Sequence, residues 1–274
     1  YIIAGTGWQQ KAFATTATVQ ISYGGSGTNT MTGDWTVGNL EFFGAAGSKT
    51  EAAASILDTN EHNLTVNGYL RMGAGSAEYL NGYFAKILFK SGTHTIAGDV
   101  SVFATQYGSR GYLDLGSSDI TLRGSINFTN MYVTPGTSTV TLAATSGTKT
   151  ITSYSQSFRD LVINPSAGVV YQLNDKLTVS GDLSIVTGTL DLNRYDLQLS
   201  GSFSNEGVLK LIGTETLTGF VNDTNSGTVN YYGSGVYSSL VAGSSYHDLV
   251  FDGSGAWTMQ DAVTCHDITL TGSA

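Results

Sequence analysis

The sequence predicts an all-β protein whose chain winds into a parallel β-helix, or β-solenoid. Three observations support this fold class: few charged residues, many glycines, and one short phrase that recurs along the chain. Only 12% of the residues are charged, about half the share of an average soluble domain, whereas 35 of the 274 residues are glycine. The chain has only two prolines, and its one helix-like run is EAAASIL at residues 51–57.

The clearest copies of the recurring phrase lie between residues 176 and 211. Residues 177–183 are LTVSGDL, and residues 197–203, which begin 20 positions later, are LQLSGSF. Apolar and polar residues alternate in both copies, and this period of two is typical of a strand with one buried face. A spacing of 20 is too short for a strand–helix–strand unit. It suits one coil of a β-solenoid, in which each turn of the chain lays its strands on the turn before.

The spacing of the copies predicts two kinds of coil. In the first half the central apolar residues of the copies are Val37, Val66, Ile96 and Leu122. The later strand centres are Leu142, Ile163, Val179 and Leu199. The steps in sequence number are 29 (37 to 66), 30 (66 to 96) and 26 (96 to 122) in the first set. The later steps are 21 (142 to 163), 16 (163 to 179) and 20 (179 to 199), counted from the preceding centre. We therefore expect irregular loops between the coils of the N-terminal half and tighter coils after it.

The expected domain organisation has two parts. Residues 1–33, rich in Thr, Gly and Ser, are predicted to form an N-terminal cap or a lead-in strand segment, and residues 34–274 to form the solenoid. At roughly 20–25 residues per coil the chain makes about 11–13 coils. Residues 267–272 (DITLTG) start a further copy of the phrase, so the solenoid is expected to be uncapped at its C-terminus. Open strand edges on the first and last coils invite end-to-end addition.

A pair of β-sandwich domains is the alternative fold, because such domains also combine short strands with glycine-rich turns. Their strands rarely repeat one phrase so closely. Coordinates with antiparallel sheets packed face to face would contradict the solenoid.

Composition also limits the partners. The formal net charge is −9, and the 12 Lys and Arg residues form no cluster that could bind phosphates, so we expect no nucleic-acid binding. No apolar run approaches the 18 or so residues that span a bilayer, so no membrane span is expected. The single cysteine, Cys265, excludes a disulfide within the chain. No cofactor is expected.

Two segments carry a family resemblance. LTVSGDLSIVTGTL at residues 177–190 resembles the degenerate repeats of bacterial surface β-solenoids, the filamentous-haemagglutinin-like adhesins and autotransporter passengers. GSFSNEGVL at residues 201–209 is similar to their small–apolar–x–Asn–x–Gly step. The resemblance is at the level of repeats and covers most of residues 34–274. It implies an extracellular or cell-surface, elongated structural or adhesive protein, and it carries over no catalytic residue.

Three functions follow from these observations. The first is a rigid β-solenoid rod that forms or decorates an extracellular surface fibre, with self-association through its open ends or edge strands. The second is a structural protein of a virion or phage tail fibre. The third is a polysaccharide-degrading β-helix enzyme, which needs two carboxyl groups about 5–10 Å apart.

Candidate carboxylate pairs lie one coil apart: Asp160 with Asp182, and Asp175 with Asp196. Asp next to Gly or Asn also ends strands at turns, and no histidine lies near these residues in the sequence. We therefore assign no catalytic residue and expect a protein that is not an enzyme.

Two further groups of residues are candidates for binding. His247 and His266 are separated by close to one coil in the sequence, and together with Asp267 they are the candidate metal ligands. The alternative is two independent turn histidines, and no metal is assigned. Aromatic residues in loop-like stretches are candidates for stacking on a surface glycan or a cell receptor, although such rings also cover the ends of a core. They are Tyr79, Tyr83, Phe84, Tyr231, Tyr232 and Tyr237.

Overall fold

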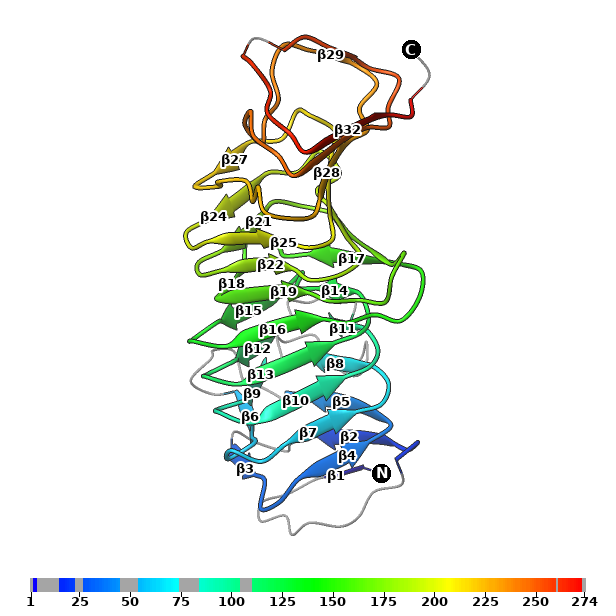
Figure 1. The fold of residues 1–274 in the computed structure, drawn as a ribbon. Coiled ribbons are helices and arrows are strands. Elements are labelled where there is room, and N and C mark those ends of the chain that lie inside the picture. Colours follow the sequence, from blue (N-terminus) through cyan, green and yellow to red (C-terminus); the bar gives the residue numbers. More distant parts are fainter. Residues whose placement is uncertain are drawn as a thin grey trace. The chain divides into compact units, whose positions relative to one another are not determined.

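The computed structural model describes residues 2–3, 15–22, 27–44, 54–73, 84–103, 110–259 and 261–272. It divides into two compact units, Tyr1–Thr141 (unit 1) and Leu142–Ala274 (unit 2), and each is described by itself. In both units the paired strands are parallel and lie one above another along the chain (Figure 1). The predicted all-β parallel β-solenoid is therefore confirmed. Within the described residues, no helix has the length and apolar character needed to cross a membrane.

Unit 1 contains three parallel ladders, and from β3 to β14 each coil places one strand in each of them. The first ladder contains β3 (Gly27–Thr30), β6 (Ser55–Asp58), β9 (Phe84–Leu88), β12 (Arg110–Asp114) and β15 (Met131–Thr134). The second contains β4 (Trp35–Val37), β7 (Leu64–Val66), β10 (Thr93–Ile96) and β13 (Asp119–Leu122), followed in the chain by β16 (Thr139–Leu142). The third contains β1 (Ile2–Ile3), β2 (Thr18–Ser22), β5 (Asn39–Phe43), β8 (Leu70–Gly73), β11 (Val100–Val102) and β14 (Ile126–Asn127).

The core of unit 1 is built from the alternating apolar residues of the phrase. In the second ladder Val37 pairs with Val66, Val66 with Ile96, and Ile96 with Leu122. All four side chains are buried. The column predicted from the spacing of these four residues is therefore confirmed. Each coil buries the apolar face of its strands against the coils on either side, which a single coil cannot do alone.

The glycine of the phrase lies at the tight corner between the second and third ladders of unit 1. The Gly68 N–H donates to the Gly38 carbonyl oxygen at 2.5 Å, and the Gly98 N–H donates to the Gly68 carbonyl oxygen at 2.7 Å. Successive backbones approach so closely here that a Cβ on Gly124 would lie 2.3 Å from the carbonyl carbon and oxygen of Gly98. The phrase therefore contains glycine because two coils touch at this corner.

Strands within residues 1–33, the predicted cap or lead-in segment, already pair in the ladders of the solenoid. β2 pairs with β5, β3 pairs with β6, and β1 pairs with β2. The helix-like run at residues 51–57 contributes residues 55–57 to β6; residues 51–53 lie outside the described residues. Leu57 pairs with Ile87 of the next coil and is buried, so cross-coil packing overrides the local helix propensity. The longer connections of this half would include residues 45–53, 74–83 and 104–109, which lie outside the described residues, so the irregular loops expected there stay a prediction.

Unit 2 also has three ladders. The first contains β18 (Ser157–Phe158), β21 (Leu177–Val179), β24 (Leu197–Leu199) and β27 (Leu217–Thr218). The second contains β19 (Asp160–Ile163), β22 (Leu183–Ile185) and β25 (Phe203–Asn205). The third contains β17 (Thr148–Thr152), β20 (Val170–Leu173), β23 (Thr189–Asp191), β26 (Val208–Leu211), β28 (Thr228–Tyr231), β30 (Asp248–Phe251) and β32 (Asp267–Leu270). A separate pair consists of β29 (Val236–Tyr237) and β31 (Ala256–Trp257).

The short step expected between Ile163 and Val179 is not a step between coils. Ile163 pairs with Ile185 in the second ladder, whereas Val179 pairs with Phe158 and Leu199 in the first. The phrase around Gly181 and Gly201 thus occupies the corner between the first and second ladders of unit 2, and not the corner that it occupies in unit 1. The third ladders hold six strands in unit 1 and seven in unit 2, one per coil. Within the described residues the third ladders thus hold thirteen strands, in agreement with the expected 11–13 coils.

Candidate functional sites

The four carboxylates weighed as catalytic pairs bond to backbone amides of neighbouring coils. The Asp182 N–H donates to Asp160 Oδ1 at 2.8 Å, and the Ser202 N–H donates to Asp182 Oδ1 at 2.7 Å. These bonds from Ser202, backbone first and then hydroxyl, lower the pKa of Asp182 below its usual 3.8, because they favour the charged carboxylate. Each carboxylate ties one coil to the next at a corner.

The second pair has the same role. Asp175 Oδ1 accepts the N–H of Ser153 at 2.7 Å, and Asp175 Oδ2 accepts the N–H of Tyr154. Asp196 Oδ1 accepts the N–H of Thr216 at 2.8 Å. Asp next to a turn commonly bonds in this way, and the bonds give all four carboxylates a structural part in holding the coils together.

Three of the six candidate aromatic rings are buried, and two lie outside the described residues. Tyr79 and Tyr83 are in the undescribed segment 74–83. Phe84, Tyr231 and Tyr237 are only 7%, 0% and 8% exposed, which agrees with the alternative that such rings cover a core. Each lies in a strand, and little of its surface is open to solvent, so a glycan has little of these three rings to stack on.

Tyr231 closes the core of the last coils of unit 2. Its ring centroid lies 4.9 Å from that of Trp257 and 5.8 Å from that of Phe251. Its hydroxyl oxygen accepts the Ala242 N–H at 3.0 Å and lies 3.2 Å from the hydroxyl oxygen of Tyr246. Burial raises the pKa of Tyr231 far above 10 and that of Tyr246 to about 12, because the charged phenolate would lose its water.

Tyr232, the sixth candidate, is half-buried and borders a shallow depression of about 350 Å³. The lining residues are Arg194, Ile212, Thr214, Tyr232, Gly233, Ser234 and Tyr237. The Tyr232 hydroxyl donates to Asp191 Oδ1 at 2.9 Å, and the ammonium of Lys210 lies 4.5 Å from the centre of the Tyr232 ring. Burial first, and then the Asp191 charge, raise the pKa of Tyr232. The depression therefore combines a fixed aromatic ring with hydroxyl groups and the exposed cation Arg194.

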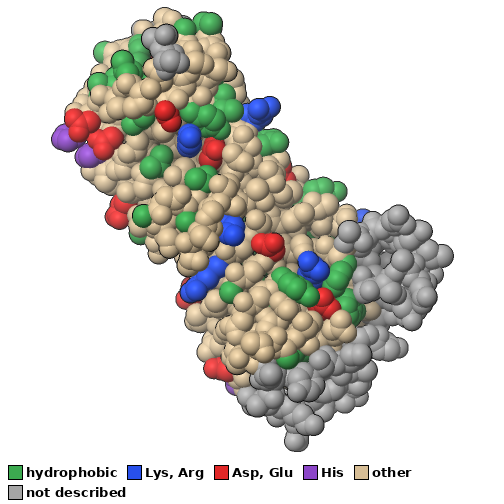
Figure 2. Space-filling view, turned by 90° about the vertical axis from the view of Figure 1, so that its right-hand side faces the viewer, with side chains coloured by type: hydrophobic (Ala, Val, Ile, Leu, Met, Phe, Trp, Pro, Cys, Tyr) green, Lys and Arg blue, Asp and Glu red, His purple; other side chains and the backbone are tan. Residues whose placement is uncertain are grey.

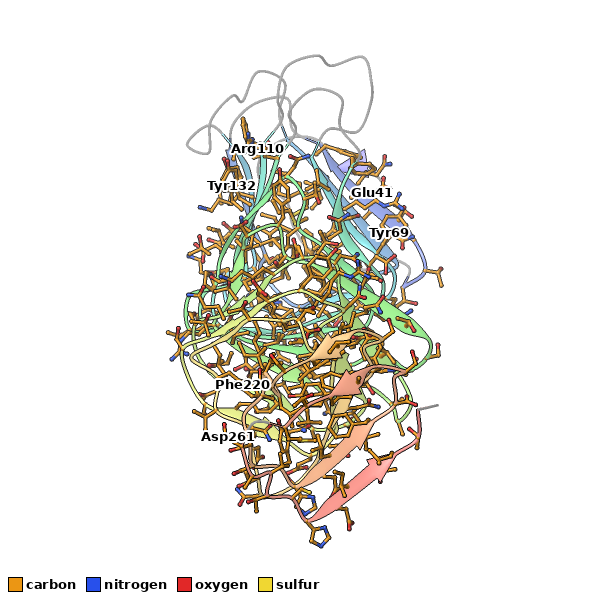
Figure 3. The ribbon with its side chains drawn as sticks, turned by 90° about the horizontal axis from the view of Figure 1, so that it is seen from above. Glu41, Tyr69, Arg110, Tyr132, Phe220 and Asp261 are labelled. Carbon is orange, nitrogen blue, oxygen red and sulfur yellow. The ribbon has the colours of Figure 1, made fainter. Side chains whose placement is uncertain are left out.

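Two ring pairs were missed in the sequence. Trp257 stacks on Tyr237 with ring centroids 3.9 Å apart and planes 14° apart. In unit 1 Tyr112 stacks on Tyr132 at 5.0 Å and 14°, and the guanidinium of Arg110 donates a hydrogen bond to the Tyr132 hydroxyl (Figure 3). The two rings of each pair lie one coil apart in the sequence and in register between adjacent strands. A search for aromatic residues at the coil spacing would have found them.

The candidate metal ligands His247 and His266 lie side by side in unit 2. His247 directly precedes β30 and His266 directly precedes β32, and these strands pair with Asp248 beside Asp267. The two imidazole rings stack with centroids 4.9 Å apart and planes 18° apart. The structure thus brings the two histidines together from adjacent coils; whether they bind a metal ion stays a prediction.

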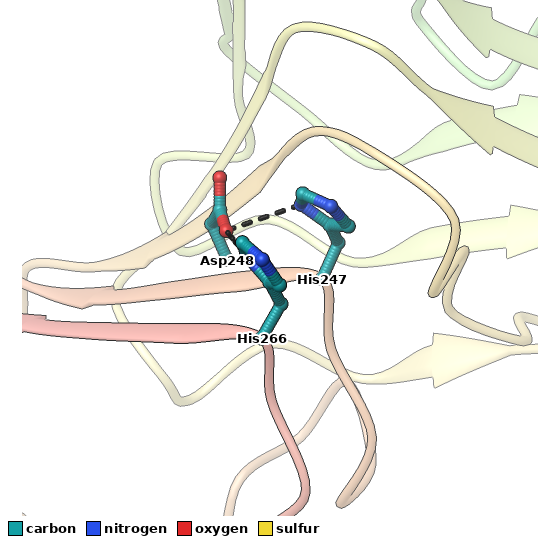
Figure 4. A group of neighbouring side chains, drawn as sticks. All are labelled: His247, Asp248 and His266. Carbon is teal, nitrogen blue, oxygen red and sulfur yellow. Dashed lines mark ion pairs between the residues drawn. The ribbon is translucent and has the colours of Figure 1, made fainter.

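Asp248, which lies next to His247 in the sequence, completes this group. Its Oδ1 lies 3.1 Å from His247 Nδ1 and 3.5 Å from His266 Nδ1 (Figure 4). One ligand atom from each of the three residues lies within 4.8 Å of the others, a separation that could hold a metal ion. Asp267, the third ligand named from the sequence, places Oδ2 3.3 Å from His266 Nδ1 but does not belong to this group. Cys265 is a half-buried free thiol and is also outside the group.

Charged side chains are otherwise dispersed. On the face shown in Figure 2 most of the surface is uncharged, and Lys and Arg side chains occur singly among Asp and Glu. No protein-family model matches the chain, and neither the curated proteins nor the solved structures that were searched contain a match.

Proposed function

We propose that this protein is an extracellular structural protein whose stacked coils form part of a surface fibre, and that copies add end to end. The observation that carries the proposal is the last strand of unit 2. β32 is the final strand of its ladder and pairs with β30 on one side. All four of its residues are exposed, including Ile268 at 54% and Leu270 at 75%.

Comparison with β30, the neighbouring strand in the ladder, shows that the apolar side chains of β32 are not covered. Leu249 and Phe251 of β30 stand in register with Ile268 and Leu270, and both are buried. Within the described residues, β32 therefore presents the same apolar pattern as β30, and no further strand covers it. A strand edge with uncovered apolar side chains is a template for pairing with another chain.

The occupant that we propose is the first coil of a second copy. Among the described residues, β1 is the edge strand of its ladder in unit 1 and pairs with β2 on one side. A parallel contact between β32 of one copy and β1 of the next would pair both edges. Such a head-to-tail contact uses two different surfaces, so it can repeat from copy to copy, and it builds a filament when the rotation between copies does not close a ring.

The resemblance of residues 177–190 and 201–209 to the repeats of filamentous-haemagglutinin-like adhesins and autotransporter passengers supports an extracellular or cell-surface location. A structural protein of a virion or phage tail fibre is the alternative, since it would use the same stacking. A polysaccharide-degrading enzyme is the weaker alternative, because the candidate carboxylate pairs bond to backbone amides.

Lysine at both Ile268 and Leu270 is expected to abolish end-to-end assembly. Burying one Ile or Leu side chain contributes about 1.5–3 kcal/mol, so losing two weakens the contact by about 100-fold or more. Sedimentation velocity over a range of concentrations and electron microscopy of the wild type and the double variant measure this effect.

The matched control is Val221→Lys with Val236→Lys, which changes the charge equally at two exposed valines of unit 2 outside β32. This control should assemble as the wild type does. A wild type that stays monomeric at its highest soluble concentration would contradict the proposal, as would equal assembly of the Ile268→Lys/Leu270→Lys variant.

A second candidate function is adhesion through an acidic glycan, and the depression beside Tyr232 supports it. Arg194 offers a guanidinium that can bind a sugar carboxylate with two parallel hydrogen bonds, and Thr214 and Ser234 supply hydroxyl groups for the ring. The overall charge of −9 makes a local cation the feature that would select an acidic sugar.

Arg194→Asn is expected to weaken binding of a uronic-acid oligosaccharide by about tenfold or more, because a hydrogen bond to a charged group contributes about 1.5–3 kcal/mol. Asn suits this position, since Arg194 has φ +71° and Asn tolerates the left-handed conformation. The control is Arg123→Asn, which removes an exposed arginine from unit 1. Titration calorimetry with the oligosaccharide measures the affinity of both variants. Equal affinities would rule out this depression as the binding site.

A further inference from the structure

Two of the three separations among the ligand atoms of His247, Asp248 and His266 are close to those of a tetrahedral metal site, and all three atoms lie within 4.8 Å of one another. Zinc binds imidazole nitrogen at about 2.0–2.1 Å and carboxylate oxygen at about 2.0–2.2 Å, so neighbouring ligand atoms lie about 3.4 Å apart. In the structure Asp248 Oδ1 lies 3.1 Å from His247 Nδ1 and 3.5 Å from His266 Nδ1. A small shift of the two histidine nitrogens toward each other would complete the three-ligand face.

Two of these atoms lack hydrogen-bond partners. His247 Nδ1 and Asp248 Oδ1 are both shielded from solvent, and neither makes a hydrogen bond to any described residue. The 3.1 Å contact between them does not have hydrogen-bond geometry. A buried polar atom without a partner is costly. A cation between the three side chains would provide a partner for both atoms.

The donor set indicates which cation fits. Two imidazole nitrogens and one carboxylate oxygen are ligands of zinc and its first-row neighbours, whereas calcium and magnesium prefer oxygen ligands. The side chain of His266 is 68% exposed, so a fourth position remains open to water.

We propose that His247, Asp248 and His266 bind one divalent transition-metal ion, with zinc as the best match, and that the ion clips β32 onto β30. The two histidines precede paired strands of successive coils, so the ion would link segments that are one full coil apart in the chain. β32 needs such a link because all four of its residues are exposed. The ion would also offset the like charges of Asp248 and Asp267, which are neighbours in the ladder. This inference does not depend on the proposed fibre function.

Titration calorimetry with zinc chloride on the full chain, stripped of metal with a chelator, tests the site. The wild type should bind one zinc ion per chain. The variant His247→Gln/His266→Gln should lose about tenfold or more in affinity, because even partners that only orient metal ligands contribute 10–100-fold. The control His62→Gln removes a histidine that lies 3.7 Å from Asp34 in unit 1, and it should bind zinc as the wild type does.

Hydrogen exchange of residues 266–271 tests the clip itself. At a zinc concentration about 100 times the wild-type dissociation constant, the ratio of closed to open β32 should rise about 100-fold in the wild type and by about tenfold or less in the double variant. Cobalt substitution should give the absorption of a four-coordinate ion. Absence of zinc binding to the wild type, unchanged binding in the double variant, or binding without protection of β32 would each overturn the proposal.

Discussion

Gly124→Ala is expected to lower the free energy of unfolding by at least about 3 kcal/mol, toward the upper end of the cost of overpacking. The new Cβ would lie 2.3 Å from the carbonyl carbon and oxygen of Gly98 and 2.5 Å from the amide nitrogen of Asp99. These are backbone atoms of the preceding coil, so no side chain can rotate away. The two coils must separate at the corner where the backbone ladder of the glycines holds them together.

Gly111→Ala is the matched control in the same unit. A Cβ there would meet only side-chain atoms, of Met72, Met131 and Val102, at 3.3–3.4 Å. Its expected change in unfolding free energy is within about 1 kcal/mol of zero, because alanine also reduces the entropy of the unfolded chain. Denaturant titrations of both variants measure the difference. Equal stability of the two variants would show that contact between backbones is not what requires glycine at residue 124.

Tyr231→Ala is expected to cost about 3–5 kcal/mol, the range for removing a large buried aromatic side chain. The fully buried ring packs against Phe251, its partner in the next strand of the ladder, and against Trp257. Removing it leaves a cavity that both neighbours line. Because coils contact mainly their neighbours, the loss should unfold the last coils of unit 2 before the rest of that unit.

Tyr231→Phe measures the contribution of the hydroxyl separately from that of the ring. It should cost about 1–3 kcal/mol, because the buried N–H of Ala242 loses its acceptor. Tyr154→Phe removes the same atom from a ring that is 50% exposed and should change stability very little. Hydrogen exchange of residues 228–251, together with denaturant titration, measures both. Equal effects of the two Phe variants would contradict the role assigned to the Tyr231 hydroxyl.

The alternation of apolar residues and the corner glycine were enough to predict the coil. Val37, Val66, Ile96 and Leu122 form the predicted column because a parallel ladder places equivalent residues above each other. The phrase does not, however, specify which corner it occupies. Any tight corner between two strands requires a glycine flanked by alternating apolar residues. The sequence therefore could not show that Ile163 and Val179 belong to different ladders and are not equivalent residues of successive coils.

The candidate sites were less predictable than the fold. A tyrosine is compatible with exposure or burial, and the next coil decides which occurs: Tyr231 is covered by Phe251 and Trp257, both of which come one coil later in the sequence. The coil spacing was sufficient to bring His247 and His266 together. It could not show that Asp248 and not Asp267 lies between them, because that depends on the side-chain directions just before β30 and β32.

The register of the first ladder in unit 2 also bears on how such a chain changes length. Leu177 pairs with Leu197, and Leu197 pairs with Leu217, so two successive steps are equal in length. Excising residues 177–196 would join Lys176 to Leu197 and give β24, β25 and β26 the neighbours that β21, β22 and β23 have now. Insertion or deletion of a whole coil therefore preserves the strand pairing of the remaining coils. A deletion of half that size would shift the strands that follow it out of register with the ladders of the preceding coil.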